Sequence, residues 1–250
     1  MRFDEKSIVI TGAGMGIGKV AAKNFANRGG MLTVMDLKED LATATAKEIE
    51  DEGGKAIGVM ADVRNYDQVK AAVDRAIETY GKIDIMINCA GTGNPKEFKD
   101  TLPSEWNFDI DICLYGVING SHAVVNHMLE RGQGKIINVC SDAGRVGERF
   151  LTIYSAAKGG VIAFTKALAR ETARKGVLVN SVCFATTLTE NIQVLLDSAP
   201  GLKEKMIKNY PIGRLATMQD QANALMLIAS DYATFIVGQT LVSNGGFAMI

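Results

Sequence analysis

The sequence lacks any long apolar run, which excludes a membrane-spanning helix. A helix that crosses a bilayer needs about 18 or more apolar residues, and no stretch of the 250 residues reaches that length. The opening letters MRFDEK are charged, and the apolar letters SIVI that follow them are too few for a signal peptide. We therefore expect no membrane partner.

Cysteine and histidine are also scarce, which argues against a metal site or a disulfide framework. The four cysteines are widely separated and form no Cys-x-x-Cys pair: Cys89, Cys113, Cys140 and Cys183. The two histidines, His122 and His127, fall on an apolar helical stretch, where packing or surface roles are expected. The small number and wide spacing of the cysteines and histidines predict a cytoplasmic chain with reduced thiols and no metal.

An excess of either charge is absent as well. The 27 basic and 28 acidic residues leave a net charge of −1, and no basic patch is dense enough to indicate nucleic acid. The chain is 47% hydrophobic and 22% charged. This composition and the length suit one large α/β domain.

What the sequence does contain is an alternation of short apolar runs with longer helical patterns. The apolar runs are predicted strands, at residues 7–11, 31–36, 55–62, 83–91, 134–141, 177–184 and 238–246. Helical spacing occupies residues 16–29, 38–54, 66–81, most of 103–131, 154–176 and 219–230. Such an alternation predicts a doubly wound parallel sheet with helices on both faces. We predict a single domain over 1–250, in which residues 184–212 break the alternation as a substrate lid.

A glycine-rich loop, TGAGMGIG, joins the first predicted strand to the first predicted helix. The spacing G-x-G-x-x-G fails, but T-G-x-x-x-G-x-G fits through Thr11, Gly12, Gly16 and Gly18. Glycines at this point let backbone N–H groups approach a pyrophosphate at a helix N-terminus. Glycine turns also serve packing, so the loop alone is a weak signal.

Two aspartates end the second and third predicted strands. Asp36 stands where a ribose 2′-hydroxyl would lie, and a carboxylate there favours NAD over NADP. Its alternative role is the N-cap of the helix at 38–52. Asp62 either borders the adenine or forms a turn.

The letters YSAAK place a phenol and an ammonium one helical turn apart. Tyr154 and Lys158 lie on one helix face, with only small residues between them. A neighbouring positive charge lowers a pKa by roughly 1–3 units, so the ammonium favours the phenolate. Taken alone, however, Y-x-x-x-K is also common on surface helices.

Together these features resemble the short-chain dehydrogenase/reductase family. The glycine loop, NCAG at 88–91, Ser141 thirteen residues before Tyr154, and Tyr-x-x-x-Lys follow the family's order over nearly the whole chain. The resemblance implies a seven-stranded Rossmann fold. It also implies NAD-dependent interconversion of a secondary alcohol and a ketone. Tyr154 would be the general acid/base, Lys158 its activator, and Ser141 the group that holds the substrate oxygen.

The same resemblance implies a cofactor site. Its predicted residues are Gly12, Met15, Gly16, Ile17, Gly18, Asp36, Leu37, Asp62, Val63, Asn88, Ala90, Gly91, Tyr154, Lys158, Thr187 and Thr189. Members of the family usually form dimers or tetramers through two long helices. We therefore expect a homo-oligomer, dimer or homotetramer, that contacts through 115–131 and 154–174.

Two of the chain's departures from the family pattern bear on turnover. Cys113 falls where the family has a catalytic Asn that supports a proton-relaying water, and a thiol is a weak donor and acceptor. Phe184-Ala185 replace the usual Pro-Gly. These departures keep an alternative open, in which the protein binds NAD(H) as a sensor or scaffold with weak or no turnover.

The loop between Ser141 and Tyr154 carries the residues predicted to border the substrate. Arg145 and Arg149 could grip a carboxylate, phosphate or coenzyme A tail, or could be solvated surface charges. The letters SDAGRVG are similar to those of alicyclic hydroxyacyl-CoA dehydrogenases, and the overall pattern also resembles 3-oxoacyl carrier protein reductases. The expected substrate is an apolar or cyclic alcohol or ketone.

Overall fold

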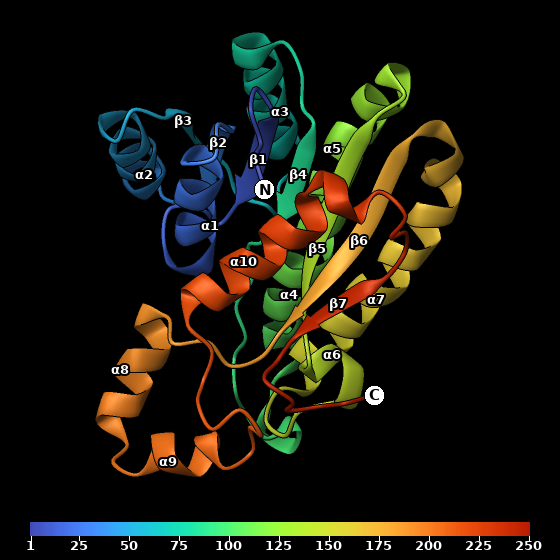
Figure 1. The fold of residues 1–250 in the computed structure, drawn as a ribbon. Helices are drawn as coiled ribbons and strands as arrows, with labels where there is room; N and C mark the ends of the chain where they lie inside the picture. Colours follow the sequence, from blue (N-terminus) through green and yellow to red (C-terminus); the bar gives the residue numbers. More distant parts are fainter.

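A single parallel sheet organises the chain. The computed structural model describes residues 1–250, and its seven strands lie in the order β3-β2-β1-β4-β5-β6-β7. Every neighbouring pair is parallel. The order reverses between β1 and β4, which is where ligands bind in open sheets of this kind. The predicted α/β class and the seven-stranded doubly wound sheet are confirmed (Figure 1).

The strands match the predicted apolar runs closely. They are β1 Ser7–Thr11, β2 Met31–Asp36, β3 Lys55–Met60, β4 Ile85–Asn88, β5 Gly134–Ser141, β6 Val177–Phe184 and β7 Thr240–Ser243. The fourth is shorter than predicted because Cys89 and Ala90 turn their N–H groups to the Thr11 hydroxyl, both at 3.0 Å. The seventh ends early because Gly245 and Gly246 take positive φ angles of 60° and 87°.

Helices cover both faces of the sheet. The longer ones are α1 Gly16–Ala26, α2 Glu39–Asp51, α3 Tyr66–Tyr80, α5 Gly116–Arg131, α7 Thr152–Thr172 and α10 Met218–Ala229. Apolar residues of α1, α2 and α10 build the core on one face, and those of α3, α5 and α7 build the core on the other. In Figure 1, α10 crosses in front of the strands, while α5 and α7 lie behind them.

The helical region predicted at 103–131 is interrupted by one wide turn. It divides into α4 Pro103–Ile110, a π-helical turn at Asp111–Tyr115, and α5. Gly116 starts α5 at a tight contact, because a Cβ there would lie 2.9 Å from Val63 Cγ2. The wide turn carries Cys113, and π-helical turns are frequent at functional sites.

The segment predicted as a lid forms two short helices away from the sheet. α8 spans Glu190–Ser198 and α9 spans Leu202–Ile207. Figure 1 shows both beyond the end of β6, below the body of the molecule. A separate small core of Leu196, Tyr210 and Leu215 holds this segment together. No helix is long and apolar enough to cross a membrane.

Candidate active site

The parallel strands bring the predicted site residues to one edge of the sheet. Thr11 ends β1, Asp36 ends β2, Asn88 ends β4 and Ser141 ends β5. Because all strands run the same way, these carboxyl ends lie side by side. The helices that follow them add the remaining candidates.

The glycine loop is shaped by close backbone approaches. Gly12 has a positive φ of 64°, and a Cβ there would lie 2.9 Å from Ala90 Cα. A Cβ on Gly18 would lie 2.2 Å from the Gly12 carbonyl oxygen. No side chain caps α1 at Met15, so the first N–H groups of the helix lack an intrahelical or capping partner. This donor set fits the pyrophosphate of a dinucleotide.

Asp36 is held firmly beside this loop. Its Oδ2 accepts from the Gly14 N–H at 2.9 Å, and its Oδ1 accepts from the Lys38 N–H at 3.1 Å. The N-cap of α2 is Lys38 rather than Asp36, so the alternative role as helix N-cap is wrong. Gly14 had not been predicted as a site residue, although its place inside the loop was a usable signal. A Cβ there would lie 2.7 Å from Leu41 Cβ.

Asp62 forms a turn, which is one of the two roles predicted for it. Its Oδ1 accepts from the Arg64 N–H at 3.0 Å, and its Oδ2 pairs with the Arg64 guanidinium at 2.6 Å. The hydrogen bond from Arg64 lowers the pKa of Asp62. Beside this turn, Val63 is buried against Gly116. At the end of β2, Leu37 is 58% exposed.

The NCAG turn directs its asparagine into the protein. Asn88 Nδ2 donates to Asn138 Oδ1 at 2.8 Å and to Ser121 Oγ at 3.1 Å. The side chain therefore ties β4 to β5 and α5, and any contact of Asn88 with a cofactor falls to its backbone. Ala90 and Gly91 continue the turn toward Lys158, since a Cβ on Gly91 would lie 3.2 Å from Lys158 Nζ.

Tyr154 and Lys158 meet at this edge. The Lys158 ammonium lies 5.6 Å from the centre of the Tyr154 ring. It is 2% exposed and donates to the Val139 carbonyl at 2.9 Å. Tyr154 rests on Gly93, where a Cβ would lie 3.3 Å from its ring, and the nearby Ser141 hydroxyl acts to lower the pKa of its phenol. The structure thus brings the three predicted catalytic residues together.

The charges of the pair influence each other. Burial raises the pKa of Tyr154, and the Lys158 charge and the Ser141 hydroxyl oppose this only in part. Lys158 acts to lower the pKa of Tyr154, as expected, but burial raises this pKa by more. Burial disfavours the charged form of Lys158, yet the Cys113 thiol and the Tyr154 phenol raise its pKa overall.

Cys113 occupies the π-helical turn and faces the same place. It is fully buried, and its thiol donates to the Thr92 carbonyl at 3.0 Å. A Cβ on Gly91 would lie 3.7 Å from Cys113 Sγ, so the thiol and the Lys158 ammonium border the same small space. The thiol's hydrogen is therefore already committed to the backbone.

The two predicted threonines lie where the lid begins. Thr187 donates to the Ala185 carbonyl at 3.0 Å and accepts from Gln221 Nε2 at 3.1 Å, and its carbonyl accepts from the Thr189 N–H at 2.7 Å. Thr189 is the N-cap of α8. Its methyl lies 3.9 Å from the position of a Cβ on Gly16, so the lid starts directly over the glycine loop.

The prediction that Arg145 could face the substrate is wrong. Its side chain is 10% exposed and pairs with the fully buried Asp142 at 3.1 Å. Arg149 is a surface charge, 78% exposed, and pairs with Glu97 at 2.9 Å. Its guanidinium also lies 4.5 Å above the Phe150 ring.

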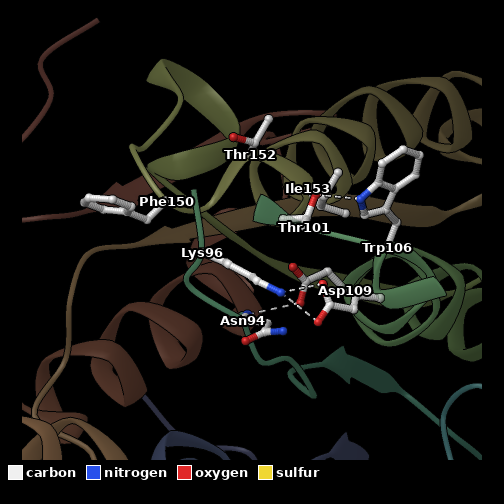
Figure 2. A pocket seen from close by; sticks show the side chains of 9 residues that line it. Asn94, Lys96, Thr101, Trp106, Asp109, Phe150, Thr152 and Ile153 are labelled. Carbon is white, nitrogen blue, oxygen red and sulfur yellow. Dashed lines mark hydrogen bonds and ion pairs between the residues drawn. The ribbon is translucent and has the colours of Figure 1, made fainter. Parts of the chain in front are cut away.

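A small cavity lies between residues 94–109 and residues 150–153. Figure 2 shows Trp106 on one side of it and Phe150 on the other, with Lys96, Asn94 and Asp109 below. Its volume is about 20 Å³, enough for one water. Asp109 is 5% exposed and accepts from the Asn94 N–H at 3.2 Å. Burial raises its pKa. Asp109 had not been predicted, because nothing in the sequence shows that it is buried.

The histidines and cysteines form no metal site. No group of three or more His, Cys, Asp or Glu side chains is placed to hold a metal ion. Both histidines are in hydrogen bonds, His127 with the Ile83 N–H at 3.2 Å and His122 with the Tyr66 hydroxyl at 3.0 Å. All four cysteines are free.

An open parallel sheet, a glycine loop after its first strand and a Tyr-x-x-x-Lys pair at the same edge define a dinucleotide-dependent class of enzyme. A family model described as short chain dehydrogenase matches residues 6–198. The chain belongs to this family of oxidoreductases, as predicted.

Several relatives span essentially the whole chain. A cis-4-hydroxycyclohexanecarboxylate dehydrogenase of Sinomonas cyclohexanicum is 36% identical over 250 residues, covering 99% of this chain and 98% of its own. A 3-oxoacyl-acyl-carrier-protein reductase of Thermotoga maritima is 31% identical over 249 residues, with 100% of both chains covered.

Solved structures agree with this assignment. A gluconate 5-dehydrogenase from Burkholderia cenocepacia, in complex with NADP and tartrate, superimposes with a TM-score of 0.93 at 33% identity, covering 98% of this chain and 96% of that one. A 7α-hydroxysteroid dehydrogenase complexed with NADH and 7-oxo glycochenodeoxycholic acid gives a TM-score of 0.93 at 32% identity, covering 98% and 95%.

Proposed function

We propose that the protein is an NAD-dependent dehydrogenase/reductase that interconverts a secondary alcohol and a ketone. The observation that carries this proposal is the convergence of Tyr154, Lys158 and Ser141 beside the glycine loop. A nicotinamide cofactor would supply the hydride acceptor or donor, while the protein orients the reactants and moves the proton.

Tyr154 would exchange the proton at the substrate oxygen. In alcohol oxidation its phenolate accepts the hydroxyl proton, and in ketone reduction its phenol donates it. Lys158, fixed through its hydrogen bond to Val139 at 2.9 Å, stabilises the phenolate form. Ser141 would bond the substrate oxygen and hold the carbinol carbon toward the cofactor.

The preference for NAD rests on Asp36. Its two backbone hydrogen bonds hold a negative charge at the end of β2. A ribose diol can donate to this carboxylate, whereas a 2′-phosphate would be repelled. The similar solved proteins bind both kinds of cofactor, NADP in one and NADH in the other, so the residue itself and not the family carries the argument.

The substrate would be an apolar or cyclic alcohol, with a hydroxyacyl-CoA thioester as a further candidate. Three of the similar proteins act, by their names, on a hydroxycyclohexanecarboxylate, a 3-oxoacyl carrier protein and a hydroxysteroid, and a fourth acts on gluconate.

The test is turnover of the purified chain with NAD⁺ and with NADP⁺. A suitable panel contains cyclohexanol, cis-4-hydroxycyclohexanecarboxylate, 3-hydroxybutyryl-CoA, gluconate and a 7α-hydroxysteroid. We expect turnover of at least one alcohol, faster with NAD⁺. Faster turnover with NADP⁺ would overturn the Asp36 argument.

One observation favours a second candidate, an NAD(H)-binding sensor or scaffold. The thiol of Cys113 donates its hydrogen to the Thr92 carbonyl. This side chain is therefore a poor hydrogen-bonding partner for a group bound beside Lys158. Enhanced NADH fluorescence without oxidation of any alcohol would support the sensor. If Cys113 limits the rate of an active enzyme, Cys113→Asn should raise kcat; an unchanged or lower kcat would contradict this.

A further inference from the structure

The residue after the predicted catalytic serine carries a charge that has no access to water. Asp142 is 0% exposed. Its Oδ1 accepts from Arg145 Nη1 at 3.1 Å and from the Cys183 thiol at 3.4 Å, while its Oδ2 has no hydrogen-bond donor. A buried carboxylate is tolerated only with a partner charge. Arg145 is the only cation paired with it.

Asp142 also forms the corner that fixes Ser141. Its N–H donates to the Phe184 carbonyl at 3.2 Å, and its carbonyl accepts from the N–H groups of Arg145 and Val146 at 2.8 and 2.9 Å. The Ser141 hydroxyl accepts from the Ala143 N–H at 3.2 Å within the same corner. A shift of Asp142 would therefore move Ser141.

Arg145 reaches from this corner to the last residues of the sequence. Its guanidinium donates to the main-chain oxygens of Ala248, at 3.4 Å, and of Ile250. The segment from Asn244 to Ile250, here called the tail segment, is shaped by its own contacts. Asn244 Nδ2 donates to the Ala248 carbonyl at 2.9 Å, and the Phe247 ring lies 5.3 Å from that of Tyr210.

We propose that Arg145 is a positioning residue for the reaction. It neutralises Asp142 and anchors the tail segment, and through Asp142 it sets the position of the Ser141 hydroxyl. This inference rests on the proposed function, since Ser141 has a role only if an alcohol or ketone binds there. The side-chain partners of Arg145 are Asp142, Ala248 and Ile250, so we assign it no direct role at the substrate or cofactor.

The loop offers a matched control. Arg149 lies four residues further on, is 78% exposed and has no contact with Asp142. For Arg145→Met we expect kcat to fall by about tenfold or more, with the NADH dissociation constant changed less than about twofold. Arg149→Met should leave both at the native values. Arg145→Lys should restore part of kcat, and added guanidinium ion should partly rescue Arg145→Ala.

A double variant separates positioning from folding. Asp142→Asn combined with Arg145→Met removes both charges, so it leaves no unpaired carboxylate and should fold even where Arg145→Met does not. We expect it to bind NADH normally and to recover part of the kcat lost in Arg145→Met, because a neutral amide can stay buried without a partner charge and keep the corner at Ser141 in place. A kcat no higher than that of folded Arg145→Met, or equal losses in Arg145→Met and Arg149→Met, would overturn the proposal.

Hydrogen exchange provides a readout that does not need turnover. In Arg145→Met, amides at 138–146 and at 244–250 should exchange faster together, whereas in Arg149→Met they should not. Unchanged exchange in both segments would refute the connection between them. If the native chain oxidised no alcohol but the two segments still changed together, the proposed function would fail and the connection would stand.

Discussion

At the scale of single residues, the candidate site depends on ionisable side chains that are buried away from water. Lys158 is 2% exposed, and its pKa is raised although burial disfavours its charged form. Tyr154 itself has a pKa raised by burial and lowered in part by Lys158. The pair therefore makes the rate sensitive to pH in a direction that depends on the reaction.

Alcohol oxidation should speed up with rising pH. It needs the phenolate, which becomes populated only as pH approaches the raised pKa of Tyr154; ketone reduction needs the phenol, so its rate is full below that pKa and falls above it. Lys158→Met should move both profiles to higher pH. Tyr154→Phe should lower kcat by about 10²–10⁴-fold with NADH still bound. Identical profiles for the native chain and Lys158→Met would contradict the assignment of Lys158.

Asp36 should decide the choice of cofactor. Asp36→Ala removes the negative charge beside the glycine loop, so the ratio of kcat/KM for NAD⁺ to that for NADP⁺ should fall by about 10–100-fold, or about 1.4–3 kcal/mol. Asp40→Ala is the control, because Asp40 is an exposed residue in the first turn of α2. Steady-state kinetics with both cofactors measures the ratio, and an unchanged ratio in Asp36→Ala would refute the prediction.

At the scale of elements, two glycines of similar backbone conformation have very different neighbours. Gly12 has φ +64° and Gly53 has φ +85°. A Cβ on Gly12 would lie 2.9 Å from Ala90 Cα, whereas nothing lies within 4 Å of a Cβ on Gly53. Substituting each glycine therefore distinguishes two effects. Both variants carry the strain of a positive φ, but only a change at Gly12 also disturbs the close approach to Ala90 that shapes the loop.

Gly53→Ala should cost only backbone strain. We expect about 1–2 kcal/mol and a Tm lower by about 2–8 °C, with normal NADH binding. Gly12→Ala should lower Tm further and weaken NADH binding by more than about tenfold, because Ala90 must move. Thermal unfolding and NADH fluorescence titration measure both effects. Equal NADH affinities in the two variants would show that the contact with Ala90 is unimportant.

The elements also show how far the sequence could lead. Strands apolar on both sides, such as Ser7–Thr11 and Met31–Asp36, were predicted to the residue because their burial is local information. The π-helical turn at 111–115 was missed because it depends on packing across the fold, such as that of Gly116 on Val63. The burial of Arg145 was missed for the same reason: its partners Asp142 and Ala248 are brought together only by the folded chain.

At the scale of the whole molecule, the outer side of α7 offers a surface for association. Ala156, Ala163 and Ala167 are exposed along it, and small residues let a second helix approach closely. Tyr115, just before α5, is 53% exposed. These features support the expected homo-oligomer through α5 and α7.

Ala163→Arg should therefore disrupt assembly. A long charged side chain at a close helix contact would prevent packing, and the variant should sediment as a smaller species than the native chain, for which we expect a dimer or tetramer. Ala44→Arg is the control, since Ala44 is an equally exposed alanine on α2. Sedimentation velocity distinguishes the species. Native-sized particles in Ala163→Arg, or a monomeric native chain, would exclude this interface.

The single tryptophan gives the protein a built-in optical probe. Trp106 is the only one in the chain; it is 36% exposed and donates from its indole to Thr101 Oγ1 at 2.9 Å. It also forms one wall of the small cavity between residues 94–109 and residues 150–153 (Figure 2). All indole emission therefore originates at this one position. Bound NADH should quench this emission by energy transfer from a single known point.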